Sequence, residues 1–362
     1  MTVGQRIRVS RHACGLSLRD LEARIERRVT AQAISKYERD EATPSTGVLI
    51  ALADALSVSV EYLVSDNHIR LEAVDFRRKQ VTSRREEARV RATVQHLLER
   101  YLGVEETLGL PSSAFDMPRE APWPVLCDPS EAEHAARGLR AYWGLGPGPI
   151  RNLVELLEER GIKILSLSLT NIDGLTARVH RAGRGVAPVI VVNRGDWGER
   201  QRFTVAHELG HLVLDAAPRI DDEKAAHRFA SAFLMPAEML RAEIGKHRKS
   251  IGWSELFELK RIFGVSVQAL TYRCKDLGIF GNPLFRQLFN EFDRHGWRSP
   301  PYKEPWALTG EQPRRFERLC FRALAEGAIS RSKAAEVLGH SIIELSRRMD
   351  EPPTLEPVSA GT

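Results

Sequence analysis

The segment 202–213 reads Arg202-Phe203-Thr204-Val205-Ala206-His207-Glu208-Leu209-Gly210-His211-Leu212-Val213. Its two histidines stand four positions apart, so they share one face of a helix at a spacing that suits two bonds to a single Zn²⁺. Glu208 follows the first histidine and is placed to act as a general base at that metal. The alternative is a pair of surface histidines on an ordinary helix. Because this helix is apolar on most sides, buried imidazoles and a buried carboxylate without a partner would be costly, and the pattern favours a metal site.

A catalytic metal held by two histidines needs a third protein ligand. The side chains that follow the motif closely enough to supply it are Asp215, Asp221, Asp222, Glu223 and His227. A turn at Ala217-Pro218 lets a helix over 221–235 fold back beside the first helix and direct Glu223 toward the metal. His227 lies one turn further along the same face, where three roles stay open. It is an alternative ligand, a hydrogen-bond donor to a ligand, or a group that stabilises the developing oxyanion.

The run from Phe203 to Pro236 resembles the ImmA/IrrE family of metallo-endopeptidases. The histidine motif, Glu223 and the segment Phe229-Ala230-Ser231-Ala232-Phe233-Leu234-Met235-Pro236 carry this resemblance, which covers residues of about 150–245. It implies a zincin-like domain with a small sheet and an active-site helix, and a repressor-type regulatory protein as substrate.

By this resemblance, the metal ligands are His207, His211 and Glu223, and the catalytic residue is Glu208. The implied cofactor is Zn²⁺, and Mn²⁺ is the other ion that we consider. His227 fits the family less well, because that position varies and often holds Asn or Asp.

Three β-like runs precede the motif, at 162–169, 175–180 and 188–193, and Gly-rich breaks between them predict hairpin-type connections. We expect an extended substrate to add itself to this sheet along an edge strand such as Pro188–Val192. Helices are expected at 131–143, 149–160, 198–214, 221–235 and 236–248.

A second pattern, from Leu18 to Arg39, is that of a helix-turn-helix. The apolar residues on the buried sides of its two helices are Leu21, Ile25 and Ile34. The second helix of such a motif brings its N-terminal residues to base edges, while the first helix crosses the DNA backbone. We therefore assign Gln32 and Ser35 to bases, with Thr30 also facing outward. The residues assigned mainly to phosphates are Ser17, Arg19, Lys36 and Arg39.

Residues 4–64 resemble an XRE-type, lambda-repressor-like helix-turn-helix domain, through Leu18-Arg19-Asp20-Leu21 and Gln32-Ala33-Ile34-Ser35-Lys36-Tyr37-Glu38. The resemblance implies a five-helix domain that binds a double-stranded DNA operator. The turn Ile25–Thr30 is two residues longer than is usual in the family and lacks its glycine, which leaves the register of the recognition helix open. The alternative use of this module is a helical bundle for protein contacts.

We divide the chain into a helix-turn-helix domain at 1–66, a linker at 67–130, a peptidase domain at 131–250 and a helical region at 251–362. The linker contains a basic run at 77–91, which either touches DNA phosphates or forms a solvated face. A long helix over 84–108 offers a contact for a homodimer, and five prolines between 111 and 130 predict a loop.

The C-terminal region repeats a helix-turn-helix rhythm at 256–277 and 324–349. Any two packed helices share that rhythm, so packing or partner binding is favoured over a second DNA reader. We expect the aromatic residues after 280 to cover the peptidase core and the last residues, 351–362, to be frayed.

The composition of the 362 residues, with 43% hydrophobic and 28% charged, is ordinary for a folded protein and excludes wholesale disorder. The expected helices and strands predict a mostly helical α+β protein. A net charge of +5 is compatible with nucleic acid. The four cysteines are far apart in the sequence, which predicts free thiols in a reducing compartment. Because we find neither the apolar core of a signal peptide nor a segment fit to span a membrane, we expect a cytoplasmic protein.

The leading hypothesis is a cytoplasmic regulator that joins operator binding to a zinc-dependent endopeptidase, which cleaves a partner repressor, or the chain itself, in response to a signal. A second hypothesis is a transcription factor that keeps the metallopeptidase fold as a sensor or scaffold without turnover. A third is an antitoxin-like regulator. Glu208 favours the first, since a purely structural zinc site has no use for a general base.

Overall fold

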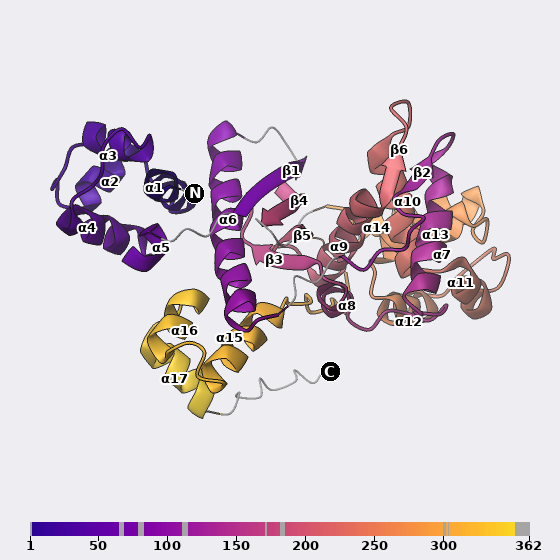
Figure 1. Cartoon of the computed structure of the whole chain (residues 1–362). Coiled ribbons are helices and arrows are strands. Elements are labelled where there is room, and N and C mark those ends of the chain that lie inside the picture. The colour runs from indigo at the N-terminus through magenta and orange to yellow at the C-terminus, as the bar shows by residue number, and fades with distance from the viewer. Residues whose placement is uncertain are drawn as a thin grey trace.

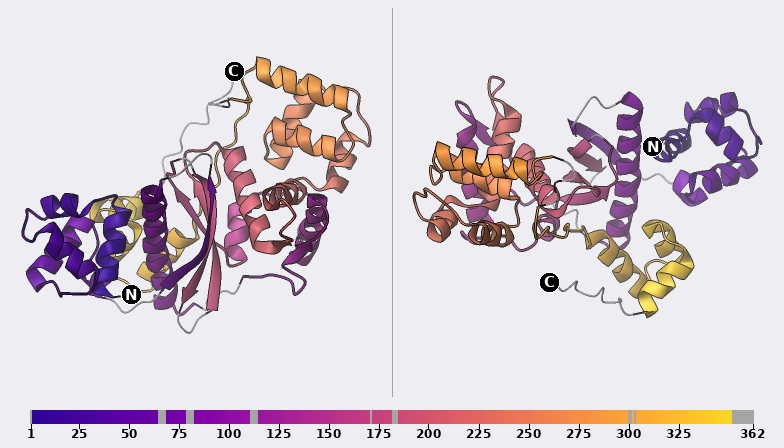
Figure 2. Two further views of the ribbon diagram at one scale, coloured as in Figure 1. Left: turned by 90° about the horizontal axis from the view of Figure 1, so that it is seen from above. Right: turned by 180° about the vertical axis from the view of Figure 1, so that it is seen from behind.

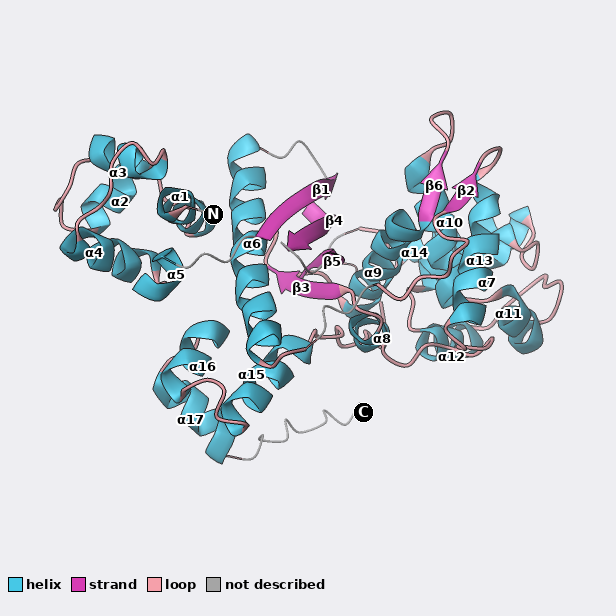
Figure 3. Ribbon diagram, in the orientation of Figure 1, coloured by secondary structure: helices cyan, strands magenta, loops and turns pink. Residues whose placement is uncertain are grey.

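The computed structural model describes residues 2–64, 69–78, 83–110, 115–170, 172–181, 185–299, 302 and 304–351. Helices lie at both ends of the chain and a sheet lies between them (Figures 1 and 3). The predicted fold class, a mostly helical α+β protein, is confirmed. In the described part of the chain, no helix is both long enough and apolar enough to cross a membrane.

The N-terminal domain consists of α1 (Val3–Ala13), α2 (Leu18–Arg24), α3 (Ala31–Glu38), α4 (Thr46–Leu56) and α5 (Val60–Val64). Side-chain oxygens of Thr2, Ser17 and Thr30 cap the first three helices by accepting a backbone N–H three residues further on. The residues predicted to be inside, among them Leu21 and Ile34, are fully buried in one apolar core. The local pattern therefore specifies this domain well.

The turn between α2 and α3 shows how the longer connection is accommodated. Glu26 and Arg27 have φ angles of 55° and 58°, in the left-handed region that side chains other than glycine enter at a cost of about 1–2 kcal/mol per residue. The chain thus accommodates two residues in a strained conformation at this turn.

The main sheet has four strands in the order β1-β4-β5-β3. They are β1 (Ile69–Arg78), β3 (Lys163–Leu167), β4 (Ile172–Arg181) and β5 (Gly185–Asn193). β4 is antiparallel to both β1 and β5, and β3 is parallel to β5. The three predicted strands are present, and β4 and β5 form one of the two predicted hairpins. The other, between β3 and β4, is wrong, because β3 pairs with β5 and Asp173-Gly174 lies inside β4.

β1 contradicts the prediction that residues 67–130 are a linker. Ile69 and Leu71 alternate with polar residues and are only 3% and 4% exposed, so this strand buries one face against the sheet's own core. The alternation is short and runs into a basic segment, which made it a weak signal. A second correction concerns the proline-rich loop, where β2 (Trp123–Val125) pairs in parallel with β6 (Leu214–Ala216).

α6 (Arg84–Thr107) covers one face of the sheet (Figure 2, left). Its residues Val90, Val94 and Leu98 share a core with Val189 and Val191 of β5. This face of α6 is therefore used within the chain and is not available for the homodimer contact that we considered. The basic run lies partly outside the described residues.

A larger core lies on the other face of the sheet, where Ile190 and Val192 of β5 meet Val205 and Leu209. The elements around it are η1 (Pro129–Glu131), α7 (Ala132–Tyr142), α8 (Leu153–Glu159), α9 (Gly198–Val213), α10 (Asp222–Leu234), α11 (Ala237–Ile244), α12 (Trp253–Phe263), α13 (Val267–Asp276) and α14 (Asn282–Arg294). This core runs without interruption across the predicted boundary between 250 and 251. Aromatic residues of α14 belong to it, as we expected.

The last three helices form a bundle of α15 (Arg315–Ala325), α16 (Arg331–Leu338) and α17 (Ile342–Asp350). Leu319 and Cys320 of α15 pack against Tyr101 of α6, and Val337 of α16 belongs to the same core. The N-terminal domain meets α6 through a buried ion pair of 2.8 Å between Arg6 and Glu99. All four cysteines are free thiols.

Candidate metal centre

α9 brings the two motif histidines to one face of a buried helix. The Nε2 atoms of His207 and His211 lie 3.0 Å apart. His207 is fully buried and Glu208 is 2% exposed. Two imidazoles so close in an apolar core need a shared partner, and a cation fits that need.

α10 folds back beside α9 and supplies the acid. The Oε2 atom of Glu223 lies 3.3 Å from His207 Nε2, and its Oε1 atom lies 3.5 Å from His211 Nε2. Gly210 permits this approach, because a Cβ at that position would come within 3.2 Å of the Cα of Ala226 on α10. A glycine on α9 thus sets the spacing of the two helices.

The three ligand atoms suit one tetrahedral ion. His207, His211 and Glu223 each offer an atom that lies within 4.8 Å of the others. Ligands about 2.0–2.1 Å from a zinc ion stand about 3.3–3.4 Å from one another in a tetrahedron, and the distances of 3.0, 3.3 and 3.5 Å bracket that value. The donor set of two nitrogens and one carboxylate oxygen is also one that zinc favours.

Two further side chains orient the histidines from behind. Asp222 Oδ2 lies 3.0 Å from His211 Nδ1, and His227 Nδ1 lies 2.8 Å from His207 Nδ1. Both contacts are made by Nδ1, so they hold each ring in one tautomer and direct its Nε2 atom toward Glu223. The structure thus supports the hydrogen-bonding role among the three left open for His227, and it gives Asp222 a role that the sequence analysis missed.

The electrostatics of the site also favour a cation. Burial acts to lower the pKa of His211, but hydrogen bonds to Asp222 and Glu223 outweigh it and raise this pKa to about 10. Hydrogen bonds from His207 and His211 lower the pKa of Glu223. Positive charge is therefore stabilised between these groups, and a metal ion supplies it when the protons leave.

The other acids that we considered as ligands lie elsewhere. Asp221 caps α10 by accepting the backbone N–H of Lys224, and Asp215 is exposed in β6. Neither is part of the metal-binding group found among the described residues.

Comparison with known families agrees with this geometry. Residues 157–275 match peptidase family M78, described as the IrrE N-terminal-like domain. Residues 7–63 match the family described as helix-turn-helix. The chain carries both of these domains. No curated protein matches the chain. The two predicted resemblances are confirmed, and β1 and α6 lie outside both matched segments.

The IrrE-like domain does not use β5 as an edge strand, which corrects the predicted docking place of a substrate. Residues 189–192 of β5 pair with β4 on one side and with β3 on the other. The strand order, rather than the sequence of the strands, decides which backbone is free, and β5 is enclosed.

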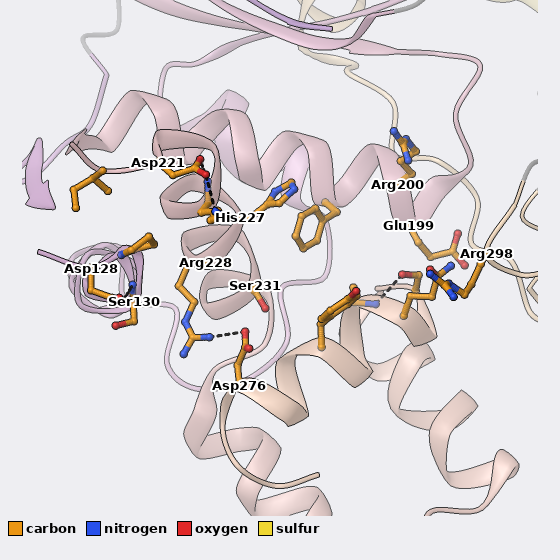
Figure 4. Close-up of a pocket in the computed structure, with 18 of the residues that line it drawn as sticks. Asp128, Ser130, Glu199, Arg200, Asp221, His227, Arg228, Ser231, Asp276 and Arg298 are labelled. Atoms are coloured by element: carbon orange, nitrogen blue, oxygen red, sulfur yellow. Dashed lines mark hydrogen bonds and ion pairs between the residues drawn. The ribbon is translucent and has the colours of Figure 1, made fainter. Parts of the chain in front are cut away.

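A cavity of about 1020 Å³ lies beside the metal group (Figure 4). Its wall includes His227 and Ser231 of α10, with Phe203 and Arg200 of α9. The ring of Phe203 meets that of His227 edge-on at 5.6 Å. Since His227 also touches His207, one side chain separates this cavity from a candidate metal ligand.

In the helix-turn-helix domain, α3 presents Gln32, Lys36 and Arg39 to solvent. Arg39 donates to Ser35 Oγ at 3.1 Å and forms an ion pair with Glu41. The hydroxyls of Ser17 and Thr30 accept backbone N–H groups at the starts of α2 and α3. The side chain of Arg19 is exposed. Of the helices of this domain, α1 and α5 lie nearest α6, and α3 lies away from it (Figures 1 and 2).

Proposed function

We propose that this chain is a DNA-binding transcriptional regulator fused to a zinc-dependent endopeptidase that cleaves a repressor-type regulatory protein in response to a signal. The observation that carries the proposal is the convergence of His207, His211 and Glu223, with Glu208 buried beside them. Three protein ligands and an adjacent carboxylate are typical of a catalytic zinc site, whereas a structural site has four ligands and no base.

The residues of the site divide the chemistry between them. A bound zinc ion supplies a Lewis acid that polarises a carbonyl and acidifies water. Glu208 takes the proton from the attacking water and passes it to the leaving amine. Asp222 and His227 hold the two imidazoles in the tautomer that leaves Nε2 free, and the buried surroundings of Glu208 keep bulk water from competing for its proton.

Helix α3 supports the DNA-binding part of the proposal. Its exposed Gln32 suits adenine, and Lys36 suits guanine or phosphate. Because α6 is contacted by α1 rather than by α3, the domain can bind DNA while it remains attached to the rest of the chain.

The test compares zinc-loaded wild type with Glu208→Gln on the proteins of the cell. We expect fragments with the wild type alone, and a rate lower by about 10²–10⁴-fold without the general base. Glu238→Gln is the matched control, since Glu238 is exposed in the first turn of α11, and it should cleave like the wild type. Fragments that persist in Glu208→Gln would refute the role of Glu208. No fragments under any inducing condition would favour the sensor or scaffold without turnover.

A further inference from the structure

The N-terminal end of β4 is the part of the sheet that lies against the catalytic glutamate. A Cβ at Gly174 would come within 2.9 Å of Thr204 Cγ2 and 3.2 Å of Glu208 Oε1, both on α9. The neighbouring Asp173 accepts a hydrogen bond of 2.8 Å from Arg200 of the same helix. The backbone of β4 at 173–176 therefore forms the rim of the site on the sheet side.

Extended polypeptides bind proteins by adding a strand to a free sheet edge. One edge of β4 is closed by β5, where Gly174 pairs with Val192. The other edge of β4 runs through Gly174, the residue that Glu208 Oε1 approaches, and a substrate strand would pair there. In this structure β1 pairs with that edge, with Arg77 opposite Gly174 and Asp75 opposite Thr176.

β1 has two parts, separated by a shift of register between Glu72 and Asp75, and the second part has a further irregularity between Arg77 and Arg78. The first part is fixed to its surroundings. Ile69 and Leu71 are buried in the core under α6, and the carbonyl oxygen of Leu71 accepts a hydrogen bond of 3.0 Å from Arg91. The second part, residues 75–78, follows the irregularity and runs along β4 opposite 172–176.

We propose that residues 75–78 of β1 compete with the substrate for the outer edge of β4, so that cleavage requires this half-strand to leave while residues 69–72 stay in place. The inference rests on the proposed peptidase function, because it concerns access to the same site. β1 lies outside the segment 157–275 that matches the IrrE-like domain. The half-strand restrains a peptidase that is fused to a DNA-binding domain.

The test locks each half of β1 to β4 with a disulfide. Antiparallel partners have Cα atoms about 4.5–5.5 Å apart, within the range of a disulfide. Asp75→Cys with Thr176→Cys locks the covering half, and Glu72→Cys with Arg178→Cys locks the fixed half as the matched control. Both pairs are built in a chain with Cys14→Ser and Cys127→Ser, because these two native thiols are exposed.

Binding is measured first, in the Glu208→Gln background, by the fluorescence anisotropy of labelled, unfolded casein. We expect oxidation of the 75–176 pair to weaken binding by about tenfold or more relative to the same protein after reduction, since a closed edge contributes no binding. Oxidation of the 72–178 pair should change binding by less than about twofold. Equal binding by the oxidised and reduced 75–176 protein, or no binding by either, would overturn the proposal.

Casein cleavage is measured in parallel with Glu208 intact and zinc present. If the 75–176 disulfide controls binding but no variant cleaves, the peptidase function fails and the competition for the edge stands. If casein is cleaved at the same rate in the oxidised and reduced states, the peptidase function stands and the competition fails.

Discussion

Glu208 and Glu223 are glutamates beside the same two histidines, but their surroundings differ. Glu208 is 2% exposed and lies against Gly174 of the sheet, whereas the side chain of Glu223 is 58% exposed and its oxygens face both histidines. An exposed carboxylate with a lowered pKa stays ionised and suits a metal ligand, while a buried one next to the site suits proton transfer. The environment therefore suits Glu223 to the proposed role of ligand and Glu208 to the proposed role of base.

Asp222 provides a test of how the histidines are oriented. We expect Asp222→Asn to weaken zinc binding by about 10–100-fold, because it removes the carboxylate that fixes the ring of His211. Zinc affinity is measured by competition with a chelator at constant pH. Asp221→Asn is the control, since asparagine also caps a helix and Asp221 does not contact His211. Equal losses in the two variants would show that local charge, and not the contact to His211, matters.

Among the elements, α9 and α10 illustrate what a sequence reveals about a site. The spacing of the histidines predicts their shared face, and the turn after α9 predicts that Glu223 returns to them. The role of Asp222 was missed because it depends on the rotation of α10 about its own axis, which a helical period alone leaves uncertain. Tertiary packing of Gly210 against Ala226 sets that rotation and the distance between the helices.

Gly210→Ala tests this close approach. An alanine gains about 1 kcal/mol in helix propensity, but its Cβ would lie 3.2 Å from Ala226 Cα and Phe229 Cδ1, and overpacking costs about 1–3 kcal/mol. We expect a lower free energy of unfolding for this variant. Zinc binding should also be weaker, because the added Cβ pushes α10, and with it Glu223, away from the histidines of α9. Gly103→Ala on α6, where a Cβ meets nothing within 4 Å, should instead stabilise. Calorimetry of the two variants with and without zinc measures both effects. A Gly210→Ala variant that is more stable than the wild type and binds zinc normally would contradict this account.

The sheet was predicted less well than the helices, and for a physical reason. The strands β3, β4 and β5 and the hairpin follow from local patterns, whereas the strand order depends on pairings between distant segments. β3 lies beside β5 rather than beside β4. β1, which precedes α6 in the sequence, pairs with the other edge of β4. No local pattern indicates either pairing, so β5 was wrongly chosen as the edge.

In the whole molecule, α6 is the element that contacts the sheet, the N-terminal domain and the C-terminal helices. One face covers the sheet, α1 contacts it through Arg6 and Glu99, and α15 packs near its C-terminal end. The ion pair is buried, with its side chains 1% and 3% exposed, so removal of one partner would leave an unpaired buried charge. The helix thus couples the DNA-binding domain to the sheet that carries β4.

His96 makes this junction sensitive to pH. Burial, and then the charges of Arg100 and Arg6, lower its pKa to about 4, against about 6.5 in an unfolded chain. Between these values the unfolded chain binds more protons at this position than the folded one. The contribution of His96 to the free energy of unfolding is therefore fully present above about pH 6.5 and is lost as the pH falls toward 4.

The expected result is a melting temperature that falls less steeply between pH 7 and pH 5 in His96→Gln than in wild type. The wild type has the edge-on contact between His96 and Tyr62 at both pH values, and the variant lacks it at both. The difference between their slopes of melting temperature against pH therefore reports the titration of His96 alone. Identical slopes would show that His96 does not titrate at this junction.

Zinc binding by wild type, Glu223→Ala and Glu238→Ala tests the central claim most directly. Each chain is stripped of metal and dialysed against buffered zinc, and its metal content is measured. We predict about one zinc ion per wild-type chain, held by two histidines and one carboxylate. Glu238→Ala should match the wild type and Glu223→Ala should lose most of its zinc. A Glu223→Ala chain that binds zinc as tightly as the wild type would contradict the account.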